Sequence, residues 1–276
     1  MKVLNHILNF YINSSIHVAL SVFSLSWITL IEFDVAYDEN VLCFIFFATI
    51  TGYNFVKYFG LAKFHHRRLA NWLRYIQLFS LICFIVLIYY VFQLQTKTLL
   101  YIVGFGVVTF LYAIPFLPKN IFLDKQHNLR SISGLKIYVI GLVWSGVTVF
   151  LPLINNEIAI SSDVILTAIQ RFILVMVLML PFEIRDLQYD SVKLSTIPQR
   201  IGEKQTKIIG VLLLLLFFFL EYFKNELNSK NIITLLFTTT ITLLFVVFAR
   251  KNQGKYYSGF WVESIPIIWL LMVLIV

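Results

Sequence analysis

Long, nearly uncharged apolar stretches follow one another along the whole chain. Each extends over roughly 18 to 25 residues, and a helix of that length crosses the ~30 Å hydrocarbon core of a bilayer. Hydrophobic residues make up 59% of the 276 and charged residues only 13%, which excludes an ordinary soluble domain. The sequence therefore predicts an all-α, polytopic membrane helical bundle with about nine transmembrane helices. The predicted helices are residues 10–31, 41–62, 75–93, 98–116, 135–154, 163–182, 207–223, 231–249 and 260–276.

Lysine and arginine are concentrated in every second connection between these stretches. Of the 22 basic residues, 18 fall on one side of the predicted bundle, three fall on the other, and Arg171 lies inside a span. An excess of Lys and Arg marks the cytoplasmic side of a membrane protein. We therefore expect a cytoplasmic N-terminus, cytoplasmic charged loops and an external C-terminus. The net charge of +8 follows from this asymmetry and does not indicate a nucleic-acid partner.

No soluble segment or long linker separates the apolar stretches, so residues 1–276 are expected to form a single integral membrane domain. Cys43 and Cys83 lie inside predicted spans and indicate neither a disulfide framework nor a metal site. Residues 1–30 lack a small-residue cleavage site after a short apolar core, which favours a retained first helix. Abundant Ile, Lys, Phe and Asn are compatible with an AT-rich bacterial genome, and we expect a bacterial inner membrane location.

Polar residues inside the predicted spans are a second source of information, because they are costly in lipid and usually face the protein interior. In the first span they recur at helical spacing, and they either bridge helices or line a cavity. This polar stripe consists of Asn9, Asn13, His17, Ser21 and Ser24. Arg171 needs a partner within its span, either an anionic ligand or a structural carboxylate or carbonyl.

The stretch "PFEIRDLQYDS" at 181–191 carries three carboxylates at the end of an apolar run. If the helix continues through it, Glu183, Asp186 and Asp190 fall at i, i+3 and i+7 and share one face. Carboxylates this close repel one another. Either the segment is a solvated charged loop, where water weakens the repulsion, or a bound cation relieves it. Mg²⁺ takes one or two carboxylates together with water and phosphate oxygens. A functional interpretation is therefore that Asp186 and Asp190 bind magnesium and a phosphorylated ligand whose tail enters the bundle.

Two segments resemble motifs of the UbiA superfamily of intramembrane prenyltransferases. "FEIRDLQYDSVKLSTIPQRIG" is similar to the second aspartate-rich motif, with Asp186 and Asp190 as its D-x-x-x-D pair and Thr196 to Pro198 as the Thr-Leu-Pro-like tail. "LYAIPFLPK" is similar to the Tyr-x-x-Pro segment and its basic residue, which places Tyr112 and Lys119 in the family positions. Nine helices with cytoplasmic charged loops are also the architecture that this resemblance implies.

The first motif of that family departs from its pattern in this chain. Its N-D-x-x-D-x-x-x-D sequence falls on "GYNFVKYFGLAKF", where Asn54 matches and Phe55, Tyr58 and Ala62 occupy the aspartate positions. The second motif also has Leu194 in place of the usual glycine. Half of the metal site that the resemblance implies is therefore missing.

Lysine can replace part of the missing positive charge, because a fixed cation also neutralises a diphosphate. Lys57 lies within the degenerate first motif, one turn after Asn54. With three other basic residues on the same predicted rim it is expected to form a collar around a diphosphate. These three are Lys119, Arg185 and Lys193. An alternative interpretation, which the sequence supports equally, is that Lys57 is an ordinary basic residue at the cytoplasmic end of its helix.

The resemblance implies a Mg²⁺-dependent transfer of a polyprenyl group from a diphosphate to an aromatic or lipid acceptor within the membrane. Asp186 and Asp190 are then the catalytic and metal-binding residues, and Asn54 and Tyr112 join the basic collar in binding substrate. The alternatives are a catalytically impaired member that binds an isoprenoid lipid or diphosphate without turnover, and a small-molecule transporter.

Overall fold

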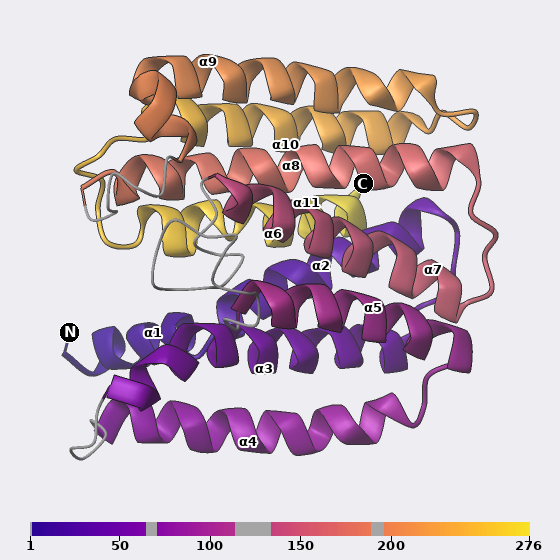
Figure 1. Cartoon of the computed structure of the whole chain (residues 1–276). Coiled ribbons are helices and arrows are strands. Elements are labelled where there is room, and N and C mark those ends of the chain that lie inside the picture. Colours follow the sequence, from indigo (N-terminus) through magenta and orange to yellow (C-terminus); the bar gives the residue numbers. More distant parts are fainter. Residues whose placement is uncertain (1, 65–70, 114–133, 189–195) are drawn as a thin grey trace, which may run out of the picture.

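Apolar helices account for nearly all of the described backbone. The structure is a computed structural model, and it describes residues 2–64, 71–113, 134–188 and 196–276. The elements are α1 (Lys2–Asn13), α2 (Ile16–Glu32), α3 (Glu39–Phe64), α4 (Asn71–Val91), α5 (Thr96–Ala113), α6 (Leu135–Ser145), η3 (Gly146–Phe150), α7 (Leu151–Asn155), α8 (Ser162–Asp186), α9 (Ile197–Phe219), η5 (Leu220–Phe223), α10 (Ser229–Phe248), η6 (Tyr257–Val262) and α11 (Ile265–Ile275). Figure 1 shows these helices running roughly side by side.

The all-helical membrane architecture predicted from the sequence is confirmed. Within the described residues, seven helical segments are long and apolar enough to span a bilayer, and the bent pair α1–α2 makes an eighth candidate. The apolar part of α5, Thr96–Leu111, is shorter than a full span. Eight of the predicted spans overlap these eight candidates, and the ninth, 98–116, overlaps α5. The total of nine stays a prediction.

The first predicted span is wrong as a single helix, because the chain bends by 58° between α1 and α2. Ser15 adopts a left-handed backbone conformation with φ 64° at the break. Backbone groups released at such a break need partners inside the protein. The carbonyl oxygen of Ser14 accepts a hydrogen bond from Asn54 Nδ2 at 2.9 Å, so α3 stabilises the bend.

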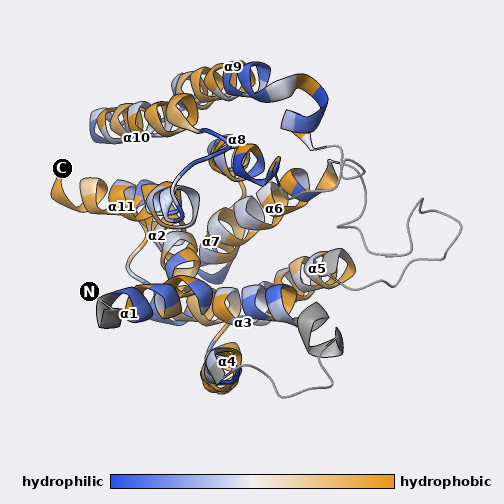
Figure 2. Ribbon diagram, turned by 90° about the vertical axis from the view of Figure 1, so that its left-hand side faces the viewer, coloured by the Kyte–Doolittle hydropathy of each residue, from blue (hydrophilic) through white to orange (hydrophobic). Residues whose placement is uncertain are grey.

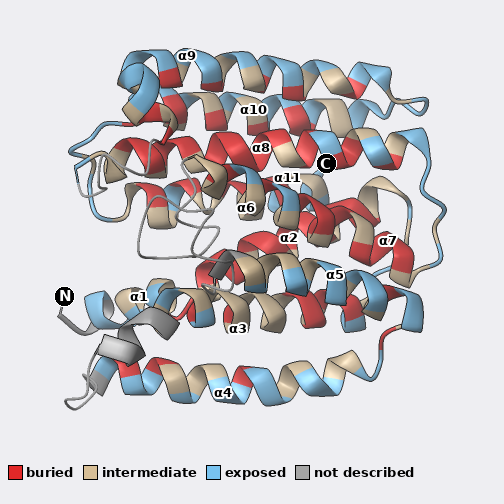
Figure 3. Cartoon of the chain, in the orientation of Figure 1, coloured by how far each residue is buried: buried red, intermediate tan, exposed pale blue. Residues whose placement is uncertain are grey.

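Helix α8 forms the centre of the bundle, and α4 lies at its margin. Buried residues make up 72% of the apolar stretch of α8 but only 11% of that of α4 (Figure 3). The main core packs Leu174 and Val177 of α8 against Leu25 of α2, Phe217 of α9 and Trp269 of α11. The charged C-terminal end of α8 is therefore held by helices from both halves of the chain.

The start of α9 corresponds to the Thr-Ile-Pro segment singled out in the sequence. Thr196 is the N-cap of α9, and its backbone N–H donates to Gln199 Oε1 at 3.0 Å, which completes a capping box. Gly202 then interrupts the helix with φ 81°. Figure 2 shows this hydrophilic, kinked beginning of α9 ahead of its apolar continuation.

Candidate ligand site at the charged end of the bundle

The ends of several helices that carry the predicted site residues gather at one end of the bundle. The C-terminal ends of α3 and α8 lie there together with the beginnings of α9 and η6 (Figure 1). Helix α8 packs against α6 and α9, and α2 packs against both α3 and α11. Side chains from the first, middle and last parts of the chain can therefore act on one ligand.

Asp186, the last residue of α8, faces basic groups of the protein. Arg185 Nε donates to Asp186 Oδ1 at 2.8 Å, and Arg185 Nη2 lies 2.8 Å from the same oxygen in an ion pair. Lys136 Nζ, at the start of α6, lies 4.0 Å from Asp186 Oδ2. The Asp186 side chain is 20% exposed, so it does not extend freely into water. Because α8 continues to Asp186, Glu183 and Asp186 share a helix face, as the sequence indicated.

Lys57 and Asn54 occupy neighbouring turns of α3 at the break between α1 and α2. Lys57 Nζ donates to Ser15 Oγ at 3.0 Å, and Ser15 Oγ donates to Asn54 Oδ1 at 2.8 Å. Asn54 Nδ2 donates to Ser14 O and to Ser80 Oγ, so the described contacts of the Asn54 amide join α2, α3 and α4. The two residues therefore differ, since Asn54 is buried and bonded within the protein while Lys57 keeps exposed surface.

The other residues at the degenerate first motif make different contacts. Phe55 is 39% exposed. Tyr58 donates from its hydroxyl to the carbonyl oxygen of Asn13 at 2.8 Å, which holds α1 to α3. These aromatic side chains offer no carboxylate at the positions where the resembled family has aspartate.

Several predicted site residues lie outside what the structure describes. The described ranges do not include Asp190, Lys119 or Lys193. Tyr112 belongs to α5, but its side chain is not described. Their roles stay predictions.

Sequence reasoning missed a carboxylate on the last span. Glu263 follows η6, and its side chain interacts electrostatically with Lys57 and with Arg185. The sequence did contain a signal for Glu263, because an ionisable residue inside a predicted span is by itself a candidate functional position. Lys136 was missed as well, because it stood in a long basic connection with no pattern of its own.

An aromatic pair lies beside the charged groups. Trp144 Nε1 donates to Tyr53 OH at 2.7 Å, and the two rings meet edge-on with centroids 6.5 Å apart. Tyr53 precedes Lys57 by four residues on α3, so both side chains project from one face. Aromatic faces attract cations, which suits a site where positive charge develops on carbon.

The described side chains show which groups could bind a magnesium ion. No cluster of three or more His, Cys, Asp or Glu side chains suited to a metal occurs in the described ranges. Asp186 already faces Arg185 and Lys136. Since Mg²⁺ often binds through one or two carboxylates and phosphate oxygens, Asp186 fits a single ion only together with Asp190 and a bound diphosphate.

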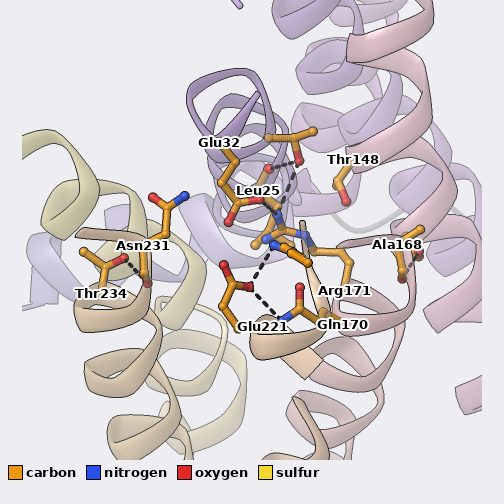
Figure 4. Close-up of polar contacts among 12 residues, drawn as sticks. Leu25, Glu32, Thr148, Ala168, Gln170, Arg171, Glu221, Asn231 and Thr234 are labelled. Carbon is orange, nitrogen blue, oxygen red and sulfur yellow. Dashed lines mark hydrogen bonds and ion pairs between the residues drawn. The ribbon is translucent and has the colours of Figure 1, made fainter. Parts of the chain in front are cut away.

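Arg171 lies in a separate buried network (Figure 4). Its side chain is 1% exposed, and Nη2 lies 3.8 Å from Glu32 Oε2 and 3.3 Å from Thr29 Oγ1. The guanidinium carbon stacks 4.8 Å from the centroid of the Trp269 ring, and Glu221 adds electrostatic attraction. Arg171 therefore has structural partners, one of the two interpretations that the sequence left open.

The polar stripe of the first span bridges helices. Asn9 Oδ1 accepts from Lys255 Nζ at 2.6 Å, and His17 Nε2 lies 2.9 Å from the carbonyl oxygen of Phe260. Ser21 Oγ donates to the carbonyl oxygen of Glu263. These contacts fasten the first span to the beginning of the last one.

No protein-family model matches the sequence, and no curated protein sequence matches it. Two solved structures resemble the fold over nearly its full length. A digeranylgeranylglyceryl phosphate synthase superposes with a TM-score of 0.60 and 14% identity, covering 98% of this chain and 97% of that one. The apo structure of a UbiA homologue from Aeropyrum pernix K1 superposes with a TM-score of 0.65 and 13% identity, covering 94% of this chain and 98% of that one.

At these identities the likeness concerns the backbone arrangement. It agrees with the resemblance carried by the second aspartate-rich motif, which is independent of the superposition. The described residues thus form an all-helical membrane bundle with the fold of these two structures, one of which is a UbiA homologue.

Proposed function

We propose that the protein is a UbiA-type intramembrane prenyltransferase, which moves a polyprenyl group from a diphosphate donor to a hydrophobic acceptor, aromatic or lipid. The fold supports an enzyme of this class. The observation that carries the proposal is the pair of cations, Lys136 and Arg185, that faces Asp186 at one end of an apolar bundle. Lys57 lies on α3, whose C-terminal end is at the same end of the bundle (Figure 1).

A polyprenyl diphosphate matches this distribution of charge and apolar surface. Its diphosphate needs cations, and its hydrocarbon tail needs a water-free interior. In the reaction the bond between the allylic carbon and the diphosphate oxygen breaks, and its electron pair leaves with the diphosphate. A bond from the acceptor to the allylic carbon forms, and the acceptor loses a proton. Fixed positive charge at the leaving oxygen lowers the barrier because it stabilises the charge that develops there.

Lys57 and Arg185 are assigned to the diphosphate. Lys57 is bonded to Ser15, the N-cap residue of α2, so an anion at Lys57 also approaches the positive end of that helix. Lys119 and Lys193 would extend the basic collar. Asn54 is assigned the task of holding Ser15 beside Lys57, in agreement with its own hydrogen bonds.

Asp186 with Asp190 would hold Mg²⁺ against the diphosphate. A bound ion would supply further neutralising charge at the leaving group. Tyr53 and Trp144 would shelter positive charge on the allylic carbon, and Tyr112 is a further candidate for that role.

A catalytically impaired protein that binds an isoprenoid diphosphate without turnover is the alternative. The observation that favours it is the loss of all three aspartates of the first motif, two of them to the aromatic residues Phe55 and Tyr58. A small-molecule transporter is the third alternative, and a charged residue inside a span, such as Arg171, is typical of one. Arg171 is, however, paired with Glu32 within the protein.

Diphosphate binding and diphosphate release separate these functions. Purified protein in lipid nanodiscs receives labelled farnesyl diphosphate and magnesium, and both bound label and released diphosphate are measured. Lys57→Met is expected to weaken binding about tenfold or more, because removing one cation near a multiply charged anion costs ~1–2 kcal/mol. Asp186→Asn is expected to abolish release.

Lys207→Met is the matched control, since Lys207 is a basic residue of α9 whose described ion pair is with Glu203. It should bind and release as the wild type does. Binding without release in the wild type favours the impaired protein. Equal binding by wild type and Lys57→Met contradicts the assignment of Lys57.

A further inference from the structure

A shallow groove runs along the outside of the bundle, where the first half of α9 meets the end of α10. It has a volume of about 290 Å³ and is walled almost entirely by apolar atoms. Ile208, Leu212 and Val247 are 44%, 59% and 46% exposed, so the groove opens away from the core. Figure 2 shows α9 and α10 in the outer layer of the bundle, where the groove faces the surrounding lipid. The lining of this α9–α10 groove consists of Lys204, Lys207, Ile208, Val211, Leu212 and Val247.

Close packing behind the groove fixes its shape. A Cβ atom on Gly210 of α9 would lie 2.9 Å from Leu180 Cδ1 of α8 and 2.9 Å from Val246 Cγ1 of α10, so the missing side chain permits this approach. Gly210 and Val246 are buried, and the next residue along each helix, Val211 and Val247, lines the groove. The groove is therefore the outer side of a packed helix pair and not the product of a loop.

The two lysines at the groove differ in their partners. Lys207 Nζ lies 2.9 Å from Glu203 Oε1, one turn earlier on α9, so its charge is balanced within the helix. Lys204 is exposed, and its ammonium group has no hydrogen bond or ion pair with the part of the chain that the structure describes. Arg250, three residues after Val247, is exposed as well. Three cations and one carboxylate thus give a net charge of +2 where α9 begins and α10 ends (Figure 1).

An apolar groove with unbalanced positive charge at one end matches the chemistry of a phospholipid. An acyl chain suits the apolar wall, and a phosphate suits the cation. A lysine at such a position packs its stem on apolar surface and holds its ammonium group at the level of the headgroups. Basic pockets between membrane helices on the cytoplasmic side bind anionic lipids. A zwitterionic lipid fits less well, because its own cation offsets its phosphate.

We infer that the α9–α10 groove binds an anionic phospholipid, with the phosphate at Lys204 and one acyl chain against Ile208, Val211, Leu212 and Val247. The charge of Lys207 is already balanced, so this residue contributes its hydrocarbon stem. The lipid would hold the outer helix pair at its charged end. This inference does not depend on the proposed function, because the groove lies on the outer surface of the bundle.

A fluorescent label beside the groove measures which lipid occupies it. Leu215→Cys, one turn beyond Val211 and 48% exposed in the wild type, carries bimane in a protein that lacks Cys43 and Cys83. The labelled protein is reconstituted in phosphatidylcholine with increasing fractions of brominated phosphatidylglycerol or brominated phosphatidylcholine, and quenching is recorded. One cation at the membrane surface favours an anionic lipid about fivefold, so half-maximal quenching is expected at about a fivefold lower fraction of phosphatidylglycerol.

Three variants and a reference label make the result specific. Lys204→Met keeps most of the apolar stem and removes the charge, so the preference at Leu215 is expected to disappear. The double variant Glu203→Gln/Lys207→Met removes an ion pair without changing the net charge and should retain the preference. Val247→Trp fills the apolar wall at an exposed position and should weaken quenching by phosphatidylglycerol. The reference label is Ile85→Cys on α4, which is 61% exposed and should show a smaller preference.

Equal quenching by the two lipids at Leu215 overturns the inference, as does a preference no larger than that at Ile85. A preference that survives Lys204→Met would not use the cation, and one that inorganic phosphate removes would not need the acyl chain, so either result overturns it too. Weak quenching by both lipids at Leu215, together with energy transfer between labelled copies, would assign the groove to a second copy of the chain instead.

Discussion

At the scale of single residues, the charges inside this bundle act in groups. Arg171, Glu32 and Glu221 interact in one buried network, and Lys57 with Glu263 belongs to another at the charged end. Arg171 Nε and Nη1 have no hydrogen-bond partner in the described structure, which leaves the guanidinium dependent on its electrostatic partners and on Trp269. Removing one member of such a group exposes the others to an uncompensated low-dielectric environment.

Arg171→Met is expected to destabilise the protein by about 3–5 kcal/mol, because Glu32 loses its buried cation, whereas Glu221 keeps Lys224 Nζ at 2.8 Å. The free energy of unfolding is measured by denaturant titration in detergent. The double variant Arg171→Met/Glu32→Gln should recover part of the loss, since it also removes the charge of Glu32 that Arg171→Met leaves without its cation. A stability of Arg171→Met equal to that of the wild type would show that the network contributes little.

At the scale of elements, helix positions followed from apolar length, but interruptions within helices did not. The break at Ser14 and Ser15, the π turn η6 and the kink at Gly202 have weak local signals. Two of them have partners elsewhere in the chain: Asn54 on α3 bonds to the break, and His17 of α2 lies 2.9 Å from the carbonyl oxygen of Phe260 in η6. These interruptions place Ser15 and Glu263 near the site, so the elements that the sequence missed are the ones that shape it.

Gly146 shows how closely two elements approach. It begins η3, and a Cβ atom there would lie 2.1 Å from Phe105 Cζ of α5. Gly146→Ala is expected to destabilise the protein by about 1–3 kcal/mol, because either the ring or the helix must move. The melting temperature in detergent measures the effect.

Gly106→Ala is the control for Gly146→Ala, since no atom lies within 4 Å of the added Cβ on α5. This change should be neutral or stabilise by about 0.5–1 kcal/mol, as expected for alanine in a helix. Equal effects of the two substitutions would contradict the close packing of α5 against η3.

At the scale of the whole molecule, the orientation in the membrane follows from charge. The end that gathers Lys57, Lys136 and Asp186 is the end that carries most of the basic connections, so the candidate site is expected to face the cytoplasm. A polyprenyl diphosphate would then enter with its charged group at the cytoplasmic surface and its tail among the helices.

Cysteine labelling tests this orientation. Two single-cysteine variants are made in a protein that lacks Cys43 and Cys83. Lys204→Cys places a thiol near the beginning of α9, and Asn228→Cys places one at the beginning of α10, at the opposite end of the bundle. A membrane-impermeant maleimide added to sealed right-side-out vesicles is expected to label Asn228→Cys and to leave Lys204→Cys unreacted until the vesicles are opened. The reverse pattern would place the charged end outside the cell.

The sequence by itself determined the membrane class, the approximate helices and the end of the bundle where chemistry is expected, because apolar length, helical spacing and basic connections are local properties of the chain. It also placed Asp186 and Lys57 at that end. The tertiary structure decided which groups meet: Lys136 beside Asp186, Glu32 beside Arg171, and Lys57 beside Ser15 at the break between α1 and α2. Those pairs join residues tens to hundreds of positions apart, and their distances arise only when the helices pack.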